Sequence, residues 1–238
     1  MIQNKFIWAD LSSYKPKKIR SFYETVFDWS YYDAEGYLTA YVGNIATSGL
    51  YETPEKFKRI KMPSFWMSYI QVESVEEIVK KAKHLGGIVE LVDMNNPIRA
   101  VALIRDTQGA GFTVYEGTYL DARTTSVENS LIFNELHVSN VQKAVEFYED
   151  LFNWRCMWTN ETQVEVFCKS SMEKLATISQ VDNFFKGKHQ YWVCTFGVRN
   201  IRETTVKIKQ CGGYVIFDEG NKVMCSDGSE AFFYVQEI

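Results

Sequence analysis

The chain carries one sequence pattern twice. Residues 21–29 read SFYETVFDW and residues 146–154 read EFYEDLFNW, a separation of 125 positions. Further landmarks repeat in the same order at nearly the same separation: Trp66 and Trp192, the glycine pairs at 86–87 and 212–213, and Phe112 and Phe233. A constant internal period indicates two copies of one structural unit. We therefore predict two domains of roughly 120 residues each, in which chemistry found in one copy can be sought in the other.

Hydrophobic periodicity predicts the same order of elements in each copy. In the first copy we expect strands at residues 6–12, 37–42, 45–51, 65–72, 88–92, 99–105 and 111–116, and helices opening at residues 15–17 and at Ser74. Ser74 followed by Glu77 is a capping-box pattern, and Gly86 is typical of a helix end. In the second copy we expect helices near residues 141–152 and 201–211. Each copy therefore contains two βαβββ modules.

The boundary between the copies is expected at residues 121–129, a polar segment short of large apolar side chains. This gives a first domain at residues 1–120 and a second at 130–238. The predicted fold class is α+β, with tandem duplicated domains that each pair two βαβββ modules in one mixed β-sheet.

The composition narrows the range of partners. Twenty-six basic and 30 acidic residues give a net charge of −4, which argues against nucleic acid, and the densest basic stretch, residues 56–61, is expected to be a solvated connection. No apolar run approaches the ~18 residues of a membrane helix, and the first residues lack a signal-peptide pattern. All five cysteines lie in the second copy without Cys-x-x-Cys spacing, which is typical of free thiols in a reducing cytoplasm.

Three stretches carry a family resemblance. Residues 138–148 (VSNVQKAVEFY), residues 65–72 (FWMSYIQV) and residues 106–110 (DTQGA) resemble the vicinal oxygen chelate superfamily, also called the glyoxalase/bleomycin-resistance/dioxygenase fold. The openings WADL at 8–11 and FNEL at 133–136 are similar to those of its two-domain, glyoxalase-like proteins. The resemblance implies cupped sheets with helices on their convex faces and a site on each concave face. The resemblance does not point to one reaction, because proteins of this fold carry out many different chemistries.

The resemblance also implies positions for metal ligands. Metal-dependent members carry His, Gln or Glu at three places in each copy, and the matching residues here are Trp8, Met67, Thr113, Phe133, Val193 and Tyr234. None of these side chains supplies the imidazole or carboxylate that a divalent ion prefers. We therefore expect no metal ion and no cofactor at these positions.

Other residues share the faces of these strands, because side chains alternate along a strand. Asp10, Tyr69 and Thr195 join the six positions as expected ligand-binding residues, so each cup would have apolar and aromatic walls with few polar groups. Glu135 and His137, two residues apart, are the candidate general acid–base pair. The alternative is that His137 lies wet at the strand end while Glu135 meets a backbone or lysine partner.

Three functions remain open from the sequence. The first is a metal-free protein that binds a small, largely apolar or aromatic molecule, as bleomycin-resistance-type relatives do. The second is an enzyme, either a metal-dependent lyase, isomerase or dioxygenase with relocated ligands or a metal-free catalyst using Glu135 and His137. The third is a non-catalytic scaffold with filled cups. We expect a cytoplasmic protein with a small-molecule ligand, with one working pocket, as a monomer or a homodimer, and without nucleic-acid or membrane partners.

Overall fold

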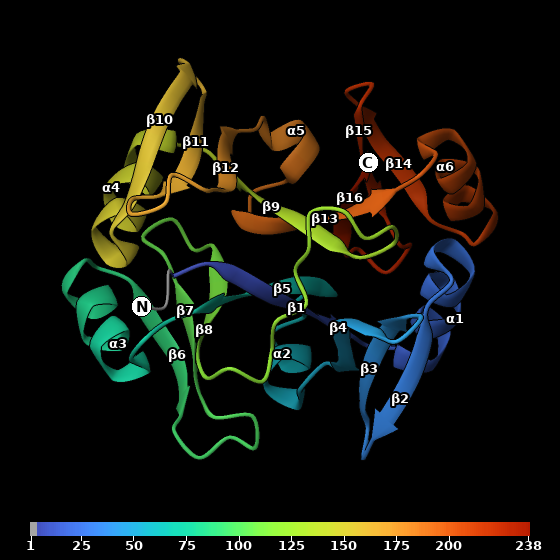
Figure 1. The fold of residues 1–238 in the computed structure, drawn as a ribbon, viewed down its shortest axis with the longest axis horizontal. Helices are drawn as coiled ribbons and strands as arrows, with labels where there is room; N and C mark the ends of the chain where they lie inside the picture. Colours follow the sequence, from blue (N-terminus) through green and yellow to red (C-terminus); the bar gives the residue numbers. More distant parts are fainter. Residues whose placement is uncertain (1–3) are drawn as a thin grey trace. The chain divides into compact units, whose positions relative to one another are not determined.

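The computed structural model describes residues 4–238 and has the predicted α+β fold (Figure 1). The first copy contains β1 (Phe6–Ser13), α1 (Pro16–Phe27), β2 (Ser30–Ala34), β3 (Tyr37–Val42), β4 (Ile45–Glu52), α2 (Glu55–Arg59), β5 (Phe65–Gln71), α3 (Val75–His84), β6 (Ile88–Asp93), β7 (Ala100–Arg105) and β8 (Gly111–Glu116). The second copy contains β9 (Leu131–Val138), α4 (Val141–Phe152), β10 (Trp154–Asn160), β11 (Gln163–Cys168), β12 (Lys174–Gln180), α5 (Asn183–Lys186), β13 (Tyr191–Val198), α6 (Ile201–Gln210), β14 (Tyr214–Asp218), β15 (Lys222–Ser226) and β16 (Phe232–Glu237).

Each copy forms one eight-stranded mixed sheet, and the two sheets have the same strand order. The first runs β2-β3-β4-β1-β5-β8-β7-β6 and the second runs β10-β11-β12-β9-β13-β16-β15-β14. In the first sheet β1 pairs parallel with β4, and β5 pairs parallel with β8, while the outer pairs are antiparallel. The predicted duplication is therefore confirmed in the topology as well as in the residues.

The helices form where apolar periodicity and caps predict them. On α1 the five buried residues are Ile19, Phe22, Tyr23, Val26 and Phe27, which follow helical spacing. The side chain of Ser74 accepts a hydrogen bond from the backbone N–H of Glu77 at the start of α3, as expected for an N-cap. Gly86 has φ +85°, the left-handed conformation in which glycine commonly ends a helix.

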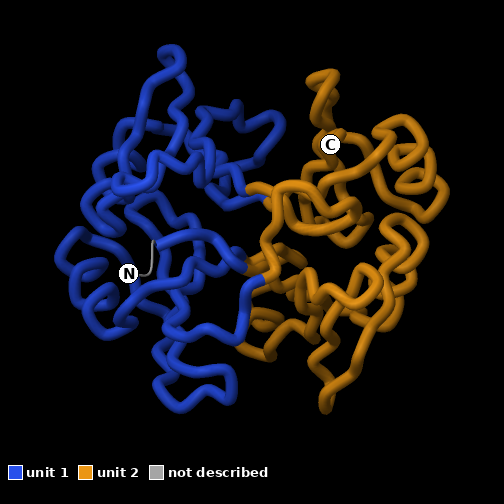
Figure 2. Tube along the Cα trace, viewed as in Figure 1, with its two compact units in different colours: residues 1–7, 68–121, 134–193 blue, residues 8–67, 122–133, 194–238 orange. Residues whose placement is uncertain are grey.

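The two compact units of the chain do not coincide with its two sheets (Figure 2). Among the described residues, one compact unit, unit 1, contains residues 4–7, 68–121 and 134–193, and the other, unit 2, contains residues 8–67, 122–133 and 194–238. Within unit 2, helix α1 of the first copy packs on helix α6 of the second, and within unit 1, α3 packs on α4. Each unit has its own hydrophobic core. The predicted linker at residues 121–129 stays a prediction.

Some elements were absent from the sequence prediction. Strand β2 was missed because four of its five residues are exposed, which leaves no apolar alternation to detect. The short helices α2 and α5 were also missed, since each is under six residues long. The basic stretch at 56–61, expected to be a plain connection, thus includes most of α2.

Two expectations from the sequence concern the state of the cysteines and the presence of a membrane-spanning helix. All five cysteines are free; Cys168, Cys194 and Cys225 are buried, while Cys156 and Cys211 are partly exposed. Among the helices of residues 4–238, none combines the length and the apolar character needed to cross a bilayer.

Candidate functional site

The tyrosine of the repeated motif lies in a buried hydrogen-bond chain in each unit. In unit 2 the indole N–H of Trp66 donates to the Tyr23 hydroxyl at 3.1 Å, and this hydroxyl donates to Oδ2 of Asp227 at 3.1 Å. Burial raises the pKa of Tyr23 well above its ordinary value, and burial also raises the pKa of Asp227. A tyrosine so enclosed holds the core together and is not placed to meet a ligand.

Unit 1 contains an equivalent hydrogen-bond chain, formed by the corresponding residues of the other copy. The indole N–H of Trp192 donates to the Tyr148 hydroxyl at 3.0 Å, which donates to Oδ2 of Asp106 at 3.1 Å. The other carboxylate oxygen of Asp106 accepts from the backbone N–H groups of Gln108 and Ala110. The Asp-Thr-Gln-Gly turn that carries the family resemblance therefore has a structural use: it presents Asp106 to the motif tyrosine.

The six positions for metal ligands lie on the central strands of the sheets. Trp8, Met67 and Thr113 lie on β1, β5 and β8, which are consecutive in the first sheet, and Phe133, Val193 and Tyr234 lie on β9, β13 and β16 of the second. Five of these side chains are buried and Phe133 is partly exposed. Their chemistry does not fit a divalent ion, because no imidazole or carboxylate is present. Within residues 4–238, no group of three or more His, Cys, Asp or Glu side chains is arranged to hold a metal.

On β1 the predicted face forms a closed polar cluster inside unit 2. The indole N–H of Trp8 donates to Oδ1 of Asp10 at 2.8 Å and to the Tyr37 hydroxyl at 3.2 Å, and that hydroxyl donates to the same Oδ1 at 2.7 Å. Burial, with the neighbouring Asp10 charge, raises the pKa of Tyr37 far above its ordinary value. Trp8 and Asp10 are each 3% exposed. We call these three residues the β1 triangle.

The β1 triangle depends on a glycine in the neighbouring strand. Gly49 lies opposite Asp10 in the parallel β1·β4 pair. A Cβ atom at Gly49 would overlap the Asp10 carboxylate and the Tyr37 hydroxyl. Glycine within a strand often marks such a close approach of other atoms to the backbone.

On β9 the predicted acid–base pair comes together inside unit 1. Oε1 of Glu135 is 3.3 Å from Nε2 of His137, and their side chains are 6% and 0% exposed. The ring of Tyr191 lies 5.6 Å from the imidazole ring, centroid to centroid. The alternative of a wet His137 at the rim of the strand is therefore wrong, because its side chain is fully buried.

The remaining predicted ligand residues fall in register pairs on neighbouring strands. Tyr69 lies opposite Thr113 in unit 1, and Thr195 lies opposite Tyr234 in unit 2. Oγ1 of Thr195 is buried and has no hydrogen-bond partner among residues 4–238. The ammonium group of Lys222 lies 4.1 Å from the centre of the Tyr234 ring, a favourable cation–π distance.

Sequence reasoning missed the partners that complete these groups. Tyr37, Gly49, Arg123, Tyr191 and Lys222 all contact predicted site residues. Each lies outside the strand of its partner, so no spacing along one strand could reveal it. Gly49 carried the one readable signal, a glycine inside an otherwise regular strand.

The comparisons with known proteins agree with this architecture. Two curated relatives, both named "Putative glyoxylase CFP32", from Mycobacterium bovis and Mycobacterium tuberculosis, are each 25% identical over 248 residues, which cover 96% of this chain and 92% of the relative. No family model matches the chain.

Solved structures share the fold at low identity. An Mn(II)-bound glyoxalase from Novosphingobium aromaticivorans matches with a TM-score of 0.67 and 13% identity, covering 98% of this chain and 81% of that one. The 2,3-dioxygenase LapB from Pseudomonas sp. KL28 matches with a TM-score of 0.66 and 9% identity, covering 98% and 92%. The duplicated modules and these likenesses define a glyoxalase-like protein. The chain has the fold of the vicinal oxygen chelate superfamily, which its sequence resemblance predicted.

Proposed function

We propose that this glyoxalase-like protein binds a small, largely apolar or aromatic molecule without a metal ion at the superfamily's metal positions. The observation that carries the proposal is the set of side chains at those six positions, which are apolar, aromatic or hydroxyl-bearing. Such side chains favour apolar contact over metal coordination. The five free thiols support a reducing compartment such as the cytoplasm.

We place the ligand on the face of β9 in preference to the face of β1. The β1 triangle satisfies its own polar atoms and is almost completely buried. On β9, Phe133 is partly exposed, and the guanidinium of Arg123 lies 5.2 Å from its ring centre within unit 2. An aromatic ring that is both accessible and paired with a cation is a suitable wall for an aromatic ligand.

Acid–base catalysis is the second candidate, favoured by the 3.3 Å separation of Glu135 and His137. A carboxylate at this distance can orient an imidazole and stabilise its protonated form. In this case a bound compound would be converted as well as held. The Glu135→Gln variant separates the two functions, because it should remove turnover while the compound still stabilises the fold.

Thermal unfolding of the full chain, with a panel of small aromatic compounds in EDTA and, separately, with metal salts without EDTA, tests the first proposal. A ligand at about 100 times its Kd adds ~2.7 kcal/mol to the free energy of unfolding, which gives a measurable rise in Tm. The Phe133→Ala variant should lose this rise. Its matched control is Tyr119→Ala, which removes an aromatic ring that is 80% exposed.

Three outcomes would reject the proposal. Stabilisation by Mn, Ni, Zn or Fe salts without any organic compound would favour the metal-dependent enzyme with relocated ligands. Stabilisation that survives in Phe133→Ala would remove the β9 face as the binding surface. No response to any compound or metal would favour the scaffold with filled cups.

A further inference from the structure

A concave surface lies in unit 2, outside the faces of the central strands. This pocket has a volume of about 870 Å³, within the range of small-molecule sites. It is bounded by the end of β1 and the first turns of α1, by residues 58–64 before β5, and by the turns at 211–212 and 227–230. Both copies of the duplication contribute to it.

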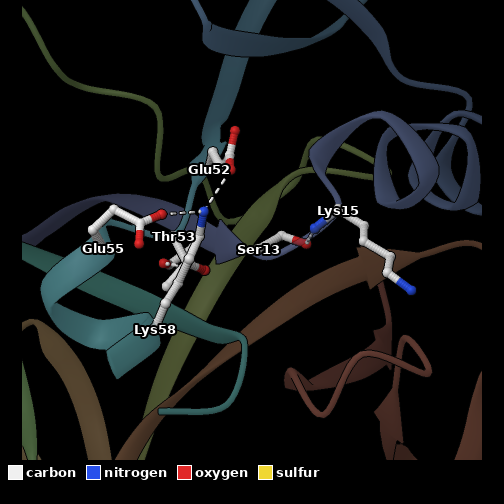
Figure 3. A network of polar contacts seen from close by, with 7 residues as sticks. Ser13, Lys15, Glu52, Thr53, Glu55 and Lys58 are labelled. Carbon is white, nitrogen blue, oxygen red and sulfur yellow. Dashed lines mark hydrogen bonds and ion pairs between the residues drawn. The ribbon is translucent and has the colours of Figure 1, made fainter. Parts of the chain in front are cut away.

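The lysines of this pocket differ in their partners. Lys58 is neutralised, since its ammonium group lies 2.6 Å from Glu52 and 2.9 Å from Glu55 (Figure 3). Lys15 extends away from that network in the same view. Within the described part of the chain, the ammonium groups of Lys15, Lys18 and Lys61 have no carboxylate at ion-pair distance. Three positive charges therefore border the pocket without a direct ion pair.

The acidic residues of the pocket do not cancel these charges. Asp227 is 4% exposed, and its carboxylate accepts hydrogen bonds from the Tyr23 hydroxyl and from the backbone and side chain of Ser229. Glu230 is the one exposed acidic residue of the lining. Among the exposed charges of the lining, Lys15, Lys18 and Lys61 therefore outnumber Glu230.

The start of α1 adds to this positive field. The first turn of α1 has no acidic residue, and its N-cap residue, Lys15, makes no side-chain capping bond. Its counterpart α4 is capped conventionally, because Oδ1 of Asn140 accepts from the backbone N–H of Lys143 at 2.9 Å. The positive end of the α1 dipole is thus left to an external anion or to water.

A hydroxyl in the lining adds a hydrogen-bonding group. Ser64 lines the pocket and is 3% exposed, and its Oγ is not one of the fully enclosed side-chain atoms of residues 4–238 that lack a partner. The hydroxyl can donate to an acceptor that enters the pocket. Beside it the lining includes the apolar side chains of Ile19, Phe22, Met62 and Pro63.

We infer that this pocket binds a small organic anion. The carboxylate or phosphate of the ligand is held by Lys15, Lys18, Lys61 and the Ser64 hydroxyl, and its apolar body lies against Ile19 and Phe22. This site is separate from the proposed β9 face and does not depend on it, since the two are formed by different side chains.

Isothermal titration of the full chain with phenyl phosphate, benzoate and inorganic phosphate tests the inference. Phenyl phosphate should bind more tightly than inorganic phosphate, because it also covers the apolar lining. The triple variant Lys15→Gln, Lys18→Gln, Lys61→Gln should weaken binding by about tenfold or more, and Ser64→Ala by about threefold to tenfold. Raising the salt concentration from about 20 mM to about 500 mM should also weaken binding.

The matched control removes the same number of positive charges from another part of the surface. Lys81→Gln, Lys83→Gln, Lys143→Gln removes three exposed lysines of unit 1 and should leave the affinity unchanged. If both triple variants weakened binding equally, the loss of affinity would come from the net charge of the protein and not from this pocket, and the proposed site would be rejected. Equal affinity for phenyl phosphate and inorganic phosphate would overturn the organic ligand class, and no saturable heat with any of the three probes would overturn the proposal.

Discussion

The two compact units share their framework and differ on their inner strands. Each unit stacks the motif tyrosine on the tryptophan that ends the motif, Tyr23 on Trp29 at 5.2 Å and Tyr148 on Trp154 at 6.0 Å, centroid to centroid. Each also bonds that tyrosine to a buried aspartate in the turn before a last strand. Where the copies agree in sequence, they therefore agree in contacts.

The inner strands show what the duplication left free to change. Asp10 on β1 and Glu135 on β9 occupy equivalent places, but Asp10 is bonded to an indole and a phenol, while Glu135 meets an imidazole. The strand partners explain part of this difference. Gly49 lies opposite Asp10 and leaves room for Tyr37, whereas Thr177 lies opposite Glu135. The framework is fixed by packing, and the inner faces carry whatever distinguishes the two copies.

The largest effect should come from the shared framework. Trp29→Ala and Trp154→Ala should each lower the free energy of unfolding by about 3–5 kcal/mol, because each removes a buried ring and an indole hydrogen bond of 2.7 Å to a backbone carbonyl. Equilibrium urea unfolding measures the loss. Trp158→Ala is the control. Because this tryptophan is 48% exposed, its removal should change the free energy of unfolding by only about 0.5 kcal/mol. Very unequal losses at Trp29 and Trp154 would break the equivalence of the frameworks.

The next effect should distinguish the inner strands. Gly49→Ala should destabilise the protein by about 1–3 kcal/mol, because the new Cβ displaces Asp10 and Tyr37 and disrupts the β1 triangle. Thr177→Ala, at the matching place in the second sheet, should cost under about 1 kcal/mol. Urea unfolding with near-ultraviolet circular dichroism reports both stability and the surroundings of Trp8. A Gly49→Ala variant as stable as the parent protein would show that the β1 triangle contributes little.

Much of this architecture could be predicted because its causes are local in sequence. The helix at residues 141–152 was predicted with the observed bounds, because its apolar spacing lies within those twelve residues. Alternation along one strand placed Trp8 and Asp10 on the same face, and their hydrogen bond confirms it. The edge strand β2 offered no such pattern and was missed.

The parts that could not be predicted depend on contacts between distant residues. Tyr37 lies 27 residues from Asp10, and Tyr23 lies 204 residues from Asp227, so neither bond has a signature in spacing. The full burial of His137 depends likewise on strands that follow it much later in the chain. Periodicity identifies the face of a strand, but the tertiary fold decides which face is covered and by what.

A smaller effect should follow from cutting the hydrogen-bond chains. Tyr23→Phe and Tyr148→Phe each leave an indole N–H and a buried aspartate with one partner fewer, so each should cost about 1–2 kcal/mol. The double variant should lose the sum of the two, because the tyrosines lie in different cores. Urea unfolding of the two single variants and the double variant measures this. A tyrosine whose loss has no effect would indicate that its unit uses the ring alone.

The smallest effect concerns pH and the two buried aspartates. Burial is the main cause that raises the folded-state pKa of Asp106 and of Asp227 above the ordinary value of 3.8. The native state therefore holds these protons more tightly than the unfolded state, so their stabilising contribution is complete below pH 3.8 and is lost as pH rises through the folded pKa. Each unit of pKa difference corresponds to about 1.4 kcal/mol.

Asparagine cannot ionise, so Asp106→Asn and Asp227→Asn remove this dependence on pH. The free energy of unfolding of each variant should fall furthest below that of the parent protein near pH 3.5, and the gap should narrow toward pH 7. Urea unfolding at three pH values measures the gap, with the exposed Asp150→Asn as control for the loss of one carboxyl group. A gap that widens with rising pH would show that the ionised carboxylates stabilise the two hydrogen-bond chains more than burial disfavours them.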